Sequence, residues 1–451
     1  MIHKVSLIKN YLQLQKSVGI IISLGLCVRI LYLSYTPYSE RTHDVLNYGG
    51  HLDYIKYVAN NLRLPESKGG WEYFQPPLYY ITAAVIYKIS NTLNFDYLIL
   101  LQILSLIYSA FFLIFGTLTL RILFKRKLTF LTSAALLAFW PSGIIHSIRI
   151  GNDPLFYMVF VISIYFLMRW LVDKQNKHFY LASLFAALTI ATKLNGVLVL
   201  GIVGIFFVST WLKTKQKRRY LIKAVFLISV VLLASYFSLF RSIRTALQDH
   251  HFNVLVGNMS EMPSGLSVGN NLRNYLYFDA NTYVTKVFTD PWNDAGGRQY
   301  FWNYFLKSML FGEFSFPSAV GQFLAKILSI LLLQMIAFLL VGLFHSIRNF
   351  KPSNLVMLLW FILSIFSLIY YRHTYPFSPD GDFRLIFPAI IPFIYFYLTG
   401  INYFIEYKLR IIEIFGYILA YYFILASCFF FMIPLGNQLM ISLHFSFSLF
   451  A

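Results

Sequence analysis

Polar residues collect at the ends of long apolar runs, and the first such group lies in "RTHDVLNYGGHLDYIKYVANNLRLP" (41–65). Asp44 follows an apolar run within a few residues, where partial desolvation raises the basicity of a carboxylate. Such a group can accept a proton from a hydroxyl or amide nucleophile, so we predict Asp44 as a general base. The alternative is a solvated helix cap. His43 and His51 are predicted substrate contacts, and Asp53 a structural residue.

A second carboxylate, Asp153, lies in "SIRIGNDP" (147–154), where Asp153-Pro154 opens another apolar run. Local preferences explain this dipeptide without any function, because Pro fits the first helical turn and Asp can cap it. They do not explain why Arg149 and Asn152 gather at the same membrane level as Asp44. We therefore predict Asp153 as a catalytic residue, Arg149 as a donor-phosphate contact and Asn152 as a substrate contact.

Three cations stand at the same end of other apolar runs: Lys193 in "TKLNG" (192–196), Arg384 in "GDFRLIFPA" (381–389), and Arg372. Cations at the rim of an apolar bundle can bind a lipid-linked phosphate through charge-assisted hydrogen bonds. A lone Lys at this position could instead snorkel to the interface. We predict that Lys193 and Arg384 bind a donor phosphate and that Arg372 contacts substrate.

Other motifs carry less information. Asp249, His250 and His251 in "QDHHFN" could bind a metal ion, but paired His residues in a polar loop are more often solvated. Aromatic and polar residues in 290–314 fit recognition of a sugar or peptide as well as ordinary packing at a membrane interface. There is no phosphate loop of the type G-x-x-x-x-G-K-[ST]. We assign no metal ligand and no required cofactor; a divalent metal ion stays an open alternative without a supporting motif.

Composition indicates the environment of these residues. The 451-residue chain is 58% hydrophobic and 12% charged, with a mean hydropathy of +0.64, whereas soluble domains carry about 25% charged residues. The chain is therefore an integral membrane protein. Most of the net charge of +19 lies in short clusters between apolar runs, where basic residues fix topology, so nucleic-acid binding is disfavoured.

The apolar runs predict about eleven transmembrane helices, since about 20 residues cross a bilayer. They lie near 17–36, 97–120, 128–148, 154–172, 179–194, 196–212, 221–240, 323–345, 354–371, 384–404 and 411–433. The crossings alternate consistently if the basic clusters at 121–127, 173–178, 213–219, 345–351 and 406–410 are all cytoplasmic. A further crossing at the short run 75–90 would break this alternation, so we predict an interfacial helix there. An ordinary span remains the alternative.

The prediction is thus an all-α polytopic protein with three regions. Residues 1–240 form a catalytic transmembrane module that includes the first outer loop, 37–96. Residues 241–322 form a larger outer loop between the seventh and eighth helices, and residues 323–451 form the C-terminal transmembrane helices. Nearly all unusual polar residues fall on the non-cytoplasmic side, where ATP is scarce.

The order of these features resembles the membrane glycosyltransferases of the GT-C superfamily, and most of all its protein O-mannosyltransferase and lipid A aminoarabinose transferase branch. The resemblance rests on Asp44, "H-x-x-Y-I-x-Y" (51–57), "Q-P-P-L-Y-Y" (75–80), "N-D-P" (152–154), "T-K-x-x-G" (192–196) and "F-R-x-x-x-P-A" (383–389). It covers residues 15–215 well and the remainder loosely. The sequence departs at Gln75, where the aminoarabinose branch carries an acidic residue, and it lacks an Asp-Glu pair, having Asp44-Val45.

The resemblance implies a hexosyltransferase that uses a polyprenyl- or dolichyl-phosphate-linked sugar on the outer or lumenal face, with inversion at the anomeric carbon. It implies that Asp44 is the base, that Asp153 is the second acidic position, and that Lys193 and Arg384 face the donor phosphate. Membrane lipid and the donor are the expected partners; the sugar and the acceptor are left open. A bacterial inner membrane is favoured over endoplasmic reticulum. The alternatives are a transporter or flippase, a non-catalytic subunit that handles lipid-linked sugars, and an oligosaccharide polymerase or ligase.

Overall fold

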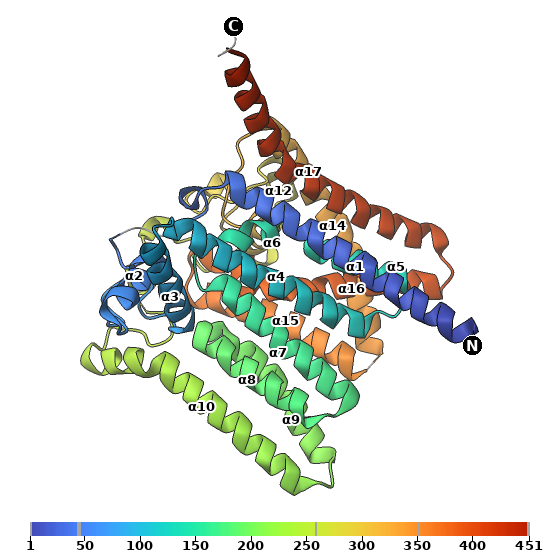
Figure 1. Cartoon of the computed structure of the whole chain (residues 1–451), viewed down its shortest axis with the longest axis horizontal. Helices are drawn as coiled ribbons and strands as arrows, with labels where there is room; N and C mark the ends of the chain where they lie inside the picture. Colours follow the sequence, from blue (N-terminus) through green and yellow to red (C-terminus); the bar gives the residue numbers. More distant parts are fainter. Residues whose placement is uncertain (1, 43–46, 258, 350, 449–451) are drawn as a thin grey trace.

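The computed structural model describes residues 2–42, 47–257, 259–349 and 351–448, and it is helical throughout, with only two isolated β-bridges in this part of the chain. The first half contains α1 (Ile2–Tyr35), α2 (His51–Asn61), α3 (Leu78–Leu93), α4 (Tyr97–Leu123), α5 (Lys127–Ala138), α6 (Pro141–Ile145), α7 (Asp153–Asp173), α8 (Asn176–Thr192), α9 (Val197–Lys213) and α10 (Lys217–Gln248). The second half contains α11 (Leu272–Leu276), α12 (Ala280–Thr285), α13 (Phe301–Phe311), α14 (Ala319–Arg348), α15 (Pro352–Thr374), α16 (Ile390–Glu406) and α17 (Arg410–Ser448). Figure 1 shows the long helices running side by side as one bundle.

Among the described residues, nine helices are long and apolar enough to cross a membrane. A tenth crossing is formed if α5 and the segment Pro141–Ile148, which meet at a bend of 50°, act as one broken span. The bend falls where Pro141, which lacks an amide N–H, begins α6. The predicted count of eleven is not confirmed: it needs α8 as a further crossing, and α8 has 17 residues, at the lower end of the range of about 17–25 that can span a bilayer.

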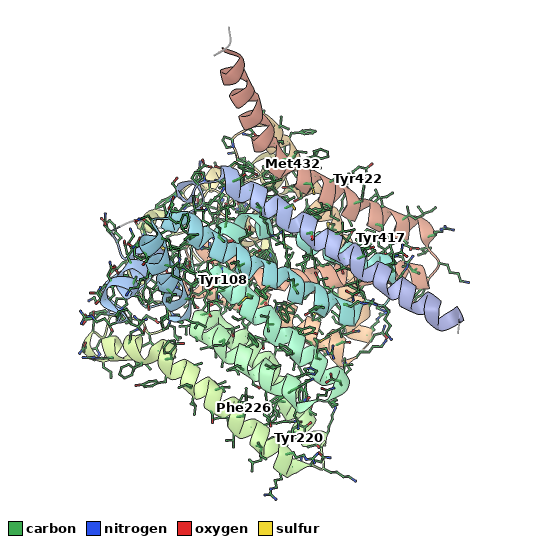
Figure 2. All side chains as sticks on the ribbon, in the orientation of Figure 1. Tyr108, Tyr220, Phe226, Tyr417, Tyr422 and Met432 are labelled. Atoms are coloured by element: carbon green, nitrogen blue, oxygen red, sulfur yellow. The ribbon has the colours of Figure 1, made fainter. Side chains whose placement is uncertain are left out.

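The outer helices expose apolar side chains as a membrane protein must. Along α10, Leu221, Val225, Leu232 and Leu233 are each more than half exposed, and the main helix contact of α10 is α8. Figure 2 shows side chains of α17, including Tyr422 and Met432, at the outer edge of the bundle. Exposed apolar surface of this extent is covered by lipid, so the chain is an integral multi-pass membrane protein.

The two ends of the bundle differ. Figure 1 shows the N-terminus and the α9–α10 and α16–α17 connections at one end, and α2 and α3 at the other. The basic clusters 213–219 and 406–410 belong to these connections. The run predicted as an interfacial helix forms α3, which has 16 residues and packs on α2 and α4. It lies with α2 at the end of the bundle and is not one of the spanning helices.

The predicted large outer loop contains α13, which is buried in the bundle. Every residue of α13 except Trp302 is buried. The indole N–H of Trp140 and the hydroxyl of Ser142 both donate to the carbonyl oxygen of Met309, at 2.8 Å and 2.7 Å. These bonds join α13 to the broken span at α6, so part of the predicted outer loop packs inside the bundle.

Helices α14 and α16 cross with their backbones in contact. A Cβ atom on Gly342 would lie 1.8 Å from the carbonyl oxygen of Phe396, and a Cβ atom on Gly400 would lie 1.9 Å from that of Phe338. Small residues permit such close approach between membrane helices. Neither position therefore tolerates a side chain.

Replacing Gly400 with Ala is expected to destabilise the protein by about 1–3 kcal/mol, the usual cost of overpacking a core. The added methyl group must push α14 and α16 apart. Thermal unfolding in detergent measures the effect. Gly204→Ala is the matched control, because no atom lies within 4 Å of a Cβ built on Gly204 in α9. Equal melting temperatures for the two variants would contradict the assignment of this crossing.

Candidate functional site

The carboxylate of Asp153 lies buried at the first residue of α7, with 4% of the residue exposed. Its Oδ1 atom is 2.5 Å from the Nζ atom of Lys193, and its Oδ2 atom is 3.8 Å from the Nε atom of Arg384. The helix N-cap is Asn152, and it makes no side-chain cap hydrogen bond. Asp153 therefore pairs with two cations from other elements, and the simple capping interpretation does not describe it.

Lys193 is held by a break between two helices. It has extended backbone angles between the end of α8 and the short helix η3 (Leu194–Gly196). A Cβ atom on Gly196 would lie 2.5 Å from the backbone carbon of Thr189, so the tight turn requires glycine at this position. The "TKLNG" sequence thus ends α8 and directs the lysine toward the start of α7.

Arg384 belongs to η8 (Phe383–Ala389) and is held by Asp382, which is fully buried. Asp382 Oδ1 accepts the backbone N–H of Arg384 at 2.9 Å, and its Oδ2 atom lies 3.3 Å from the Nε atom of Arg384. Arg149 is also buried, and burial, followed by the charge of Arg384, lowers the pKa of its guanidinium. Three cations and two carboxylates therefore lie together in the buried part of this site.

Arg372 lies in an adjoining group instead of contacting Asp153. Its charge acts on Asp380, which also lies within electrostatic range of Arg384 and Glu313. Within the described residues, Arg372 Nη1 and Asp380 Oδ2 are buried without a hydrogen-bond partner. The hydroxyl of Tyr304 in α13 donates to Glu313. The large loop thus supplies further polar side chains to the same end of the bundle.

The first loop packs against the start of α7 through His51 and Gln75. His51 Nδ1 lies 2.8 Å from the hydroxyl of Tyr80, and a Cβ atom on Gly151 would lie 3.3 Å from the His51 ring. Asn152 donates to Gln75 Oε1 at 3.2 Å and to the carbonyl of Thr192 at 3.3 Å. Gln75 is therefore a direct neighbour of Asn152, the predicted substrate contact. This is the position where the sequence departs from the aminoarabinose transferase branch.

The structure thus brings together Asp153, Lys193, Arg384 and Arg149, with Asn152 and His51 beside them, and their roles in binding and catalysis stay predictions. The predicted base Asp44 and its neighbour His43 lie outside the described residues. Sequence reasoning missed Asp382, Asp380 and Glu313. Asp382 lies two residues before Arg384, and this short spacing between opposite charges was the feature of the sequence that indicated an ion pair.

Arg241 in α10 is a further residue that sequence reasoning missed. Its Nη1 atom donates to the carbonyls of Pro65 and Tyr73, at 2.7 Å and 2.9 Å. Its Nη2 atom donates to the hydroxyl of Tyr54 and the carbonyl of Gln75, at 2.6 Å and 3.1 Å. One guanidinium therefore holds the first loop to the end of α10.

Replacing Arg241 with Met is expected to loosen residues 62–75 by about 2 kcal/mol, because hydrogen bonds to a charged group are lost and carbonyls are left unpaired. Amide hydrogen exchange measures this as a roughly thirtyfold faster exchange of the segment. Arg244→Met, which removes an exposed Arg one turn away, is the control. Unchanged exchange in the Arg241 variant would show that the loop is held by other contacts.

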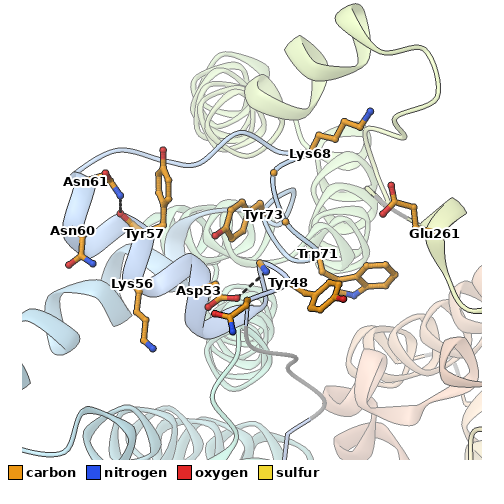
Figure 3. A pocket seen from close by; sticks show the side chains of 14 residues that line it. Tyr48, Asp53, Lys56, Tyr57, Asn60, Asn61, Lys68, Trp71, Tyr73 and Glu261 are labelled. Atoms are coloured by element: carbon orange, nitrogen blue, oxygen red, sulfur yellow. Dashed lines mark hydrogen bonds between the residues drawn. The ribbon is translucent and has the colours of Figure 1, made fainter.

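A cavity of about 690 Å³ opens in the first loop between α2 and residues 68–73 (Figure 3). Lys56, Tyr57 and Asn60 on α2 lie on one side of it and Trp71 on the other. Asp53 also lines it, but its Oδ2 atom accepts the backbone N–H groups of Gly49 and Gly50 at 3.0 Å and 3.3 Å, which agrees with a structural role. Aromatic faces beside amides and charged groups suit a polar ligand such as a sugar or peptide.

No group of three or more His, Cys, Asp or Glu side chains is placed to hold a metal ion within the described residues. In the "QDHHFN" segment, Asp249 forms an ion pair with Lys68. The adjacent His250 and His251 are exposed. The alternative of a metal site in this segment therefore gains no support from the described side chains.

The fold is that of the GT-C membrane glycosyltransferases. Over 93% of this chain and 55% of the other, it matches the archaeal oligosaccharyltransferase AglB from Archaeoglobus fulgidus, in complex with an inhibitory peptide and a dolichol-phosphate, at 13% identity and a TM-score of 0.50. The chain thus spans about half the length of AglB. ArnT from Cupriavidus metallidurans, bound to undecaprenyl phosphate, aligns over 85% of this chain and 77% of its own at 9% identity and a TM-score of 0.38.

Within this class, residues 74–236 match the family model described as dolichyl-phosphate-mannose-protein mannosyltransferase. The matched region contains Asp153, Lys193 and Arg149 and ends before Arg241. No curated protein matches the chain. The resemblance read from the sequence is therefore confirmed at the level of the GT-C fold.

Proposed function

We propose that the protein transfers a sugar from a polyprenyl- or dolichyl-phosphate donor to an acceptor on the non-cytoplasmic face of the membrane. The observation that carries this proposal is the buried cluster of Asp153, Lys193, Arg384, Asp382 and Arg149, which brings three cations to one place. The match of residues 74–236 to a family described by its dolichyl-phosphate-mannose donor supports a lipid-linked sugar. A bacterial inner membrane remains the favoured location.

The proposed reaction is an inverting displacement. An acceptor hydroxyl or amide attacks the anomeric carbon while Asp44 takes its proton, which is the role of a general base. The bond between the anomeric carbon and the phosphate oxygen breaks, and its electron pair stays on the phosphate. Lys193 and Arg384, oriented by Asp153 and Asp382, stabilise the charge that develops on the departing lipid phosphate.

The cavity of the first loop is the proposed acceptor side of the reaction. His51 begins the helix that lines the cavity, and the same residue touches the segment before Asp153. Trp71 and Tyr57 supply aromatic faces against which a sugar or peptide can pack. This arrangement connects an exposed binding surface to the ion cluster through one short helix.

Replacing Trp71 with Ala is expected to raise the KM for acceptor on the order of tenfold, because about 1.4 kcal/mol of aromatic contact is lost. The kcat should change less than about twofold, since among the described residues no bond or ring contact joins Trp71 to the ion cluster. Steady-state transfer kinetics separate the two constants. Phe95→Ala removes an aromatic side chain that is 63% exposed outside the cavity and should alter neither. A fall in kcat alone would contradict an acceptor role.

Reconstitution tests the proposed function directly. The purified protein is placed in liposomes with a panel of polyprenyl-phosphate sugars and candidate acceptors, and release of free polyprenyl phosphate is measured. Acceptor-dependent release supports the transferase. The absence of release with every donor, combined with movement of the donor between leaflets, would favour a transporter or flippase; binding without release or movement would favour a non-catalytic subunit.

A further inference from the structure

A second charged cavity lies at the end of the bundle opposite to the first loop. It has a volume of about 510 Å³ and is formed by the α7–α8 and α9–α10 connections together with the start of α10. Four cations line it: Lys174, Lys213, Arg219 and Lys223. None of the described residues that line it is acidic. Figure 2 labels Tyr220, another lining residue, at this end of α10.

One of these four cations, Lys223, is buried. Only 4% of the residue is exposed. Its Nζ atom lies 4.3 Å from the ring centre of Tyr220, 5.6 Å from that of Trp170 and 5.7 Å from that of Phe179. It forms no ion pair with any carboxylate in the described part of the chain. Aromatic faces compensate only part of the cost of burying an ammonium group, so a neighbouring anion would stabilise Lys223.

Asp173, which precedes Lys174 in the sequence, is already paired with other residues. Asp173 lies 2.9 Å from His178 Nδ1 and 3.3 Å from Arg169 Nη2. Burial lowers the pKa of the adjacent Lys174. Lys217 directs its Nζ atom to the carbonyl of Trp211 at 2.7 Å. The four lining cations therefore repel one another without a carboxylate between them, and this repulsion favours a bound anion.

A smaller cavity of about 360 Å³ adjoins the first and shares Lys174, Thr210 and Lys213 with it. It adds one more cation, Lys351, and the apolar side chains of Leu171, Phe206 and Leu355. A cationic cavity that continues along apolar side chains matches a phospholipid, whose headgroup phosphate lies beside its acyl chains. A free phosphate would use only the first cavity.

We propose that this double cavity binds the headgroup of an anionic phospholipid, at the membrane surface opposite to the candidate transfer site. Basic pockets between membrane helices are known to take such headgroups. The phosphate of the lipid lies among Lys213, Arg219 and Lys223, and its acyl chains lie along Leu171 and Leu355. This site is independent of the proposed transfer reaction.

The test is binding of short-chain phosphatidylglycerol to the full-length protein in a neutral detergent, compared with short-chain phosphatidylcholine, glycerol phosphate and inorganic phosphate. Phosphatidylglycerol is expected to bind at least on the order of tenfold more tightly than each of the others. The double variant Lys213→Gln/Arg219→Gln should lose this preference. Its two side chains are exposed, so the variant is expected to fold. Lys125→Gln/Lys127→Gln, on the α4–α5 connection, is the matched control.

Each outcome decides the proposal. Equal affinity for phosphatidylglycerol and glycerol phosphate would assign the site to a soluble phosphate and overturn a lipid site. Equal affinity of the double variant and its control would place the lipid elsewhere on the protein. Lys223→Met provides a second measurement: bound lipid should raise the melting temperature of the wild-type protein more than that of this variant. Because no readout involves sugar transfer, failure here leaves the proposed function untouched.

Discussion

Replacing Asp44 with Asn is expected to slow sugar transfer by about 10²- to 10⁴-fold, the usual contribution of a general base. The amide cannot take a proton from the acceptor, yet it is nearly the same size as the carboxylate. Binding of the lipid-phosphate donor should therefore persist. Single-turnover transfer measures the rate, and titration with a polyprenyl phosphate measures binding.

The control is Asp96→Asn. Asp96 is an exposed residue that caps α4 by accepting the backbone N–H of Leu98 at 2.8 Å, so this change should leave transfer within about twofold of wild type. Near-normal turnover of the Asp44 variant would remove Asp44 from the mechanism. The base would then have to be sought among the carboxylates that the structure brings together.

The second large effect is expected at Lys193. Lys193→Met should weaken binding of polyprenyl phosphate by about 10- to 100-fold, since one buried charge-assisted contact is worth about 1.5–3 kcal/mol. It should also destabilise the protein by about 1–3 kcal/mol, because the carboxylate of Asp153 loses the nearer of its two cation partners. Binding titrations and thermal unfolding measure these two effects separately.

The double variant Lys193→Met/Asp153→Asn separates the two roles. It removes both charges of the pair, so stability should largely recover, as when other buried ion pairs are replaced together. Donor binding should stay weak, because no ammonium group faces the phosphate. Recovery of binding along with stability would make the pair structural and would leave Arg384 and Arg149 as the donor contacts.

Much of the fold follows from hydrophobic length alone. Apolar runs located the long helices, because a bilayer demands about 20 apolar residues for each crossing. The count of eleven is not confirmed, because α8 has 17 residues, at the short end of the range for a crossing, and because the chain bends at Pro141 after α5. Neither deviation appears in average hydropathy. The burial of α13 was also not predicted, because it depends on hydrogen bonds from residues far away in sequence.

The candidate site was predicted to the extent that its residues occupy helix ends. Asp153, Lys193 and Arg384 each stand where an apolar run meets the same end of the bundle, so topology brings them together. Asp382 and Glu313 were missed because acidic residues in turns are ordinarily solvated. The role of Asp382 emerges only from its burial, and that of Glu313 from its bond to Tyr304 in α13, and both are properties of tertiary packing.

Arg241 connects α10 to the first loop. α10 packs mainly on α8, so lipid surrounds most of its surface, yet its guanidinium is bonded to four groups of the first loop. A helix in a bilayer responds to a change in hydrocarbon thickness by tilting. Tilting of α10 would move the bonds that Arg241 and Ser242 make to this loop, so a change in the thickness of the surrounding membrane would be transmitted to the first loop.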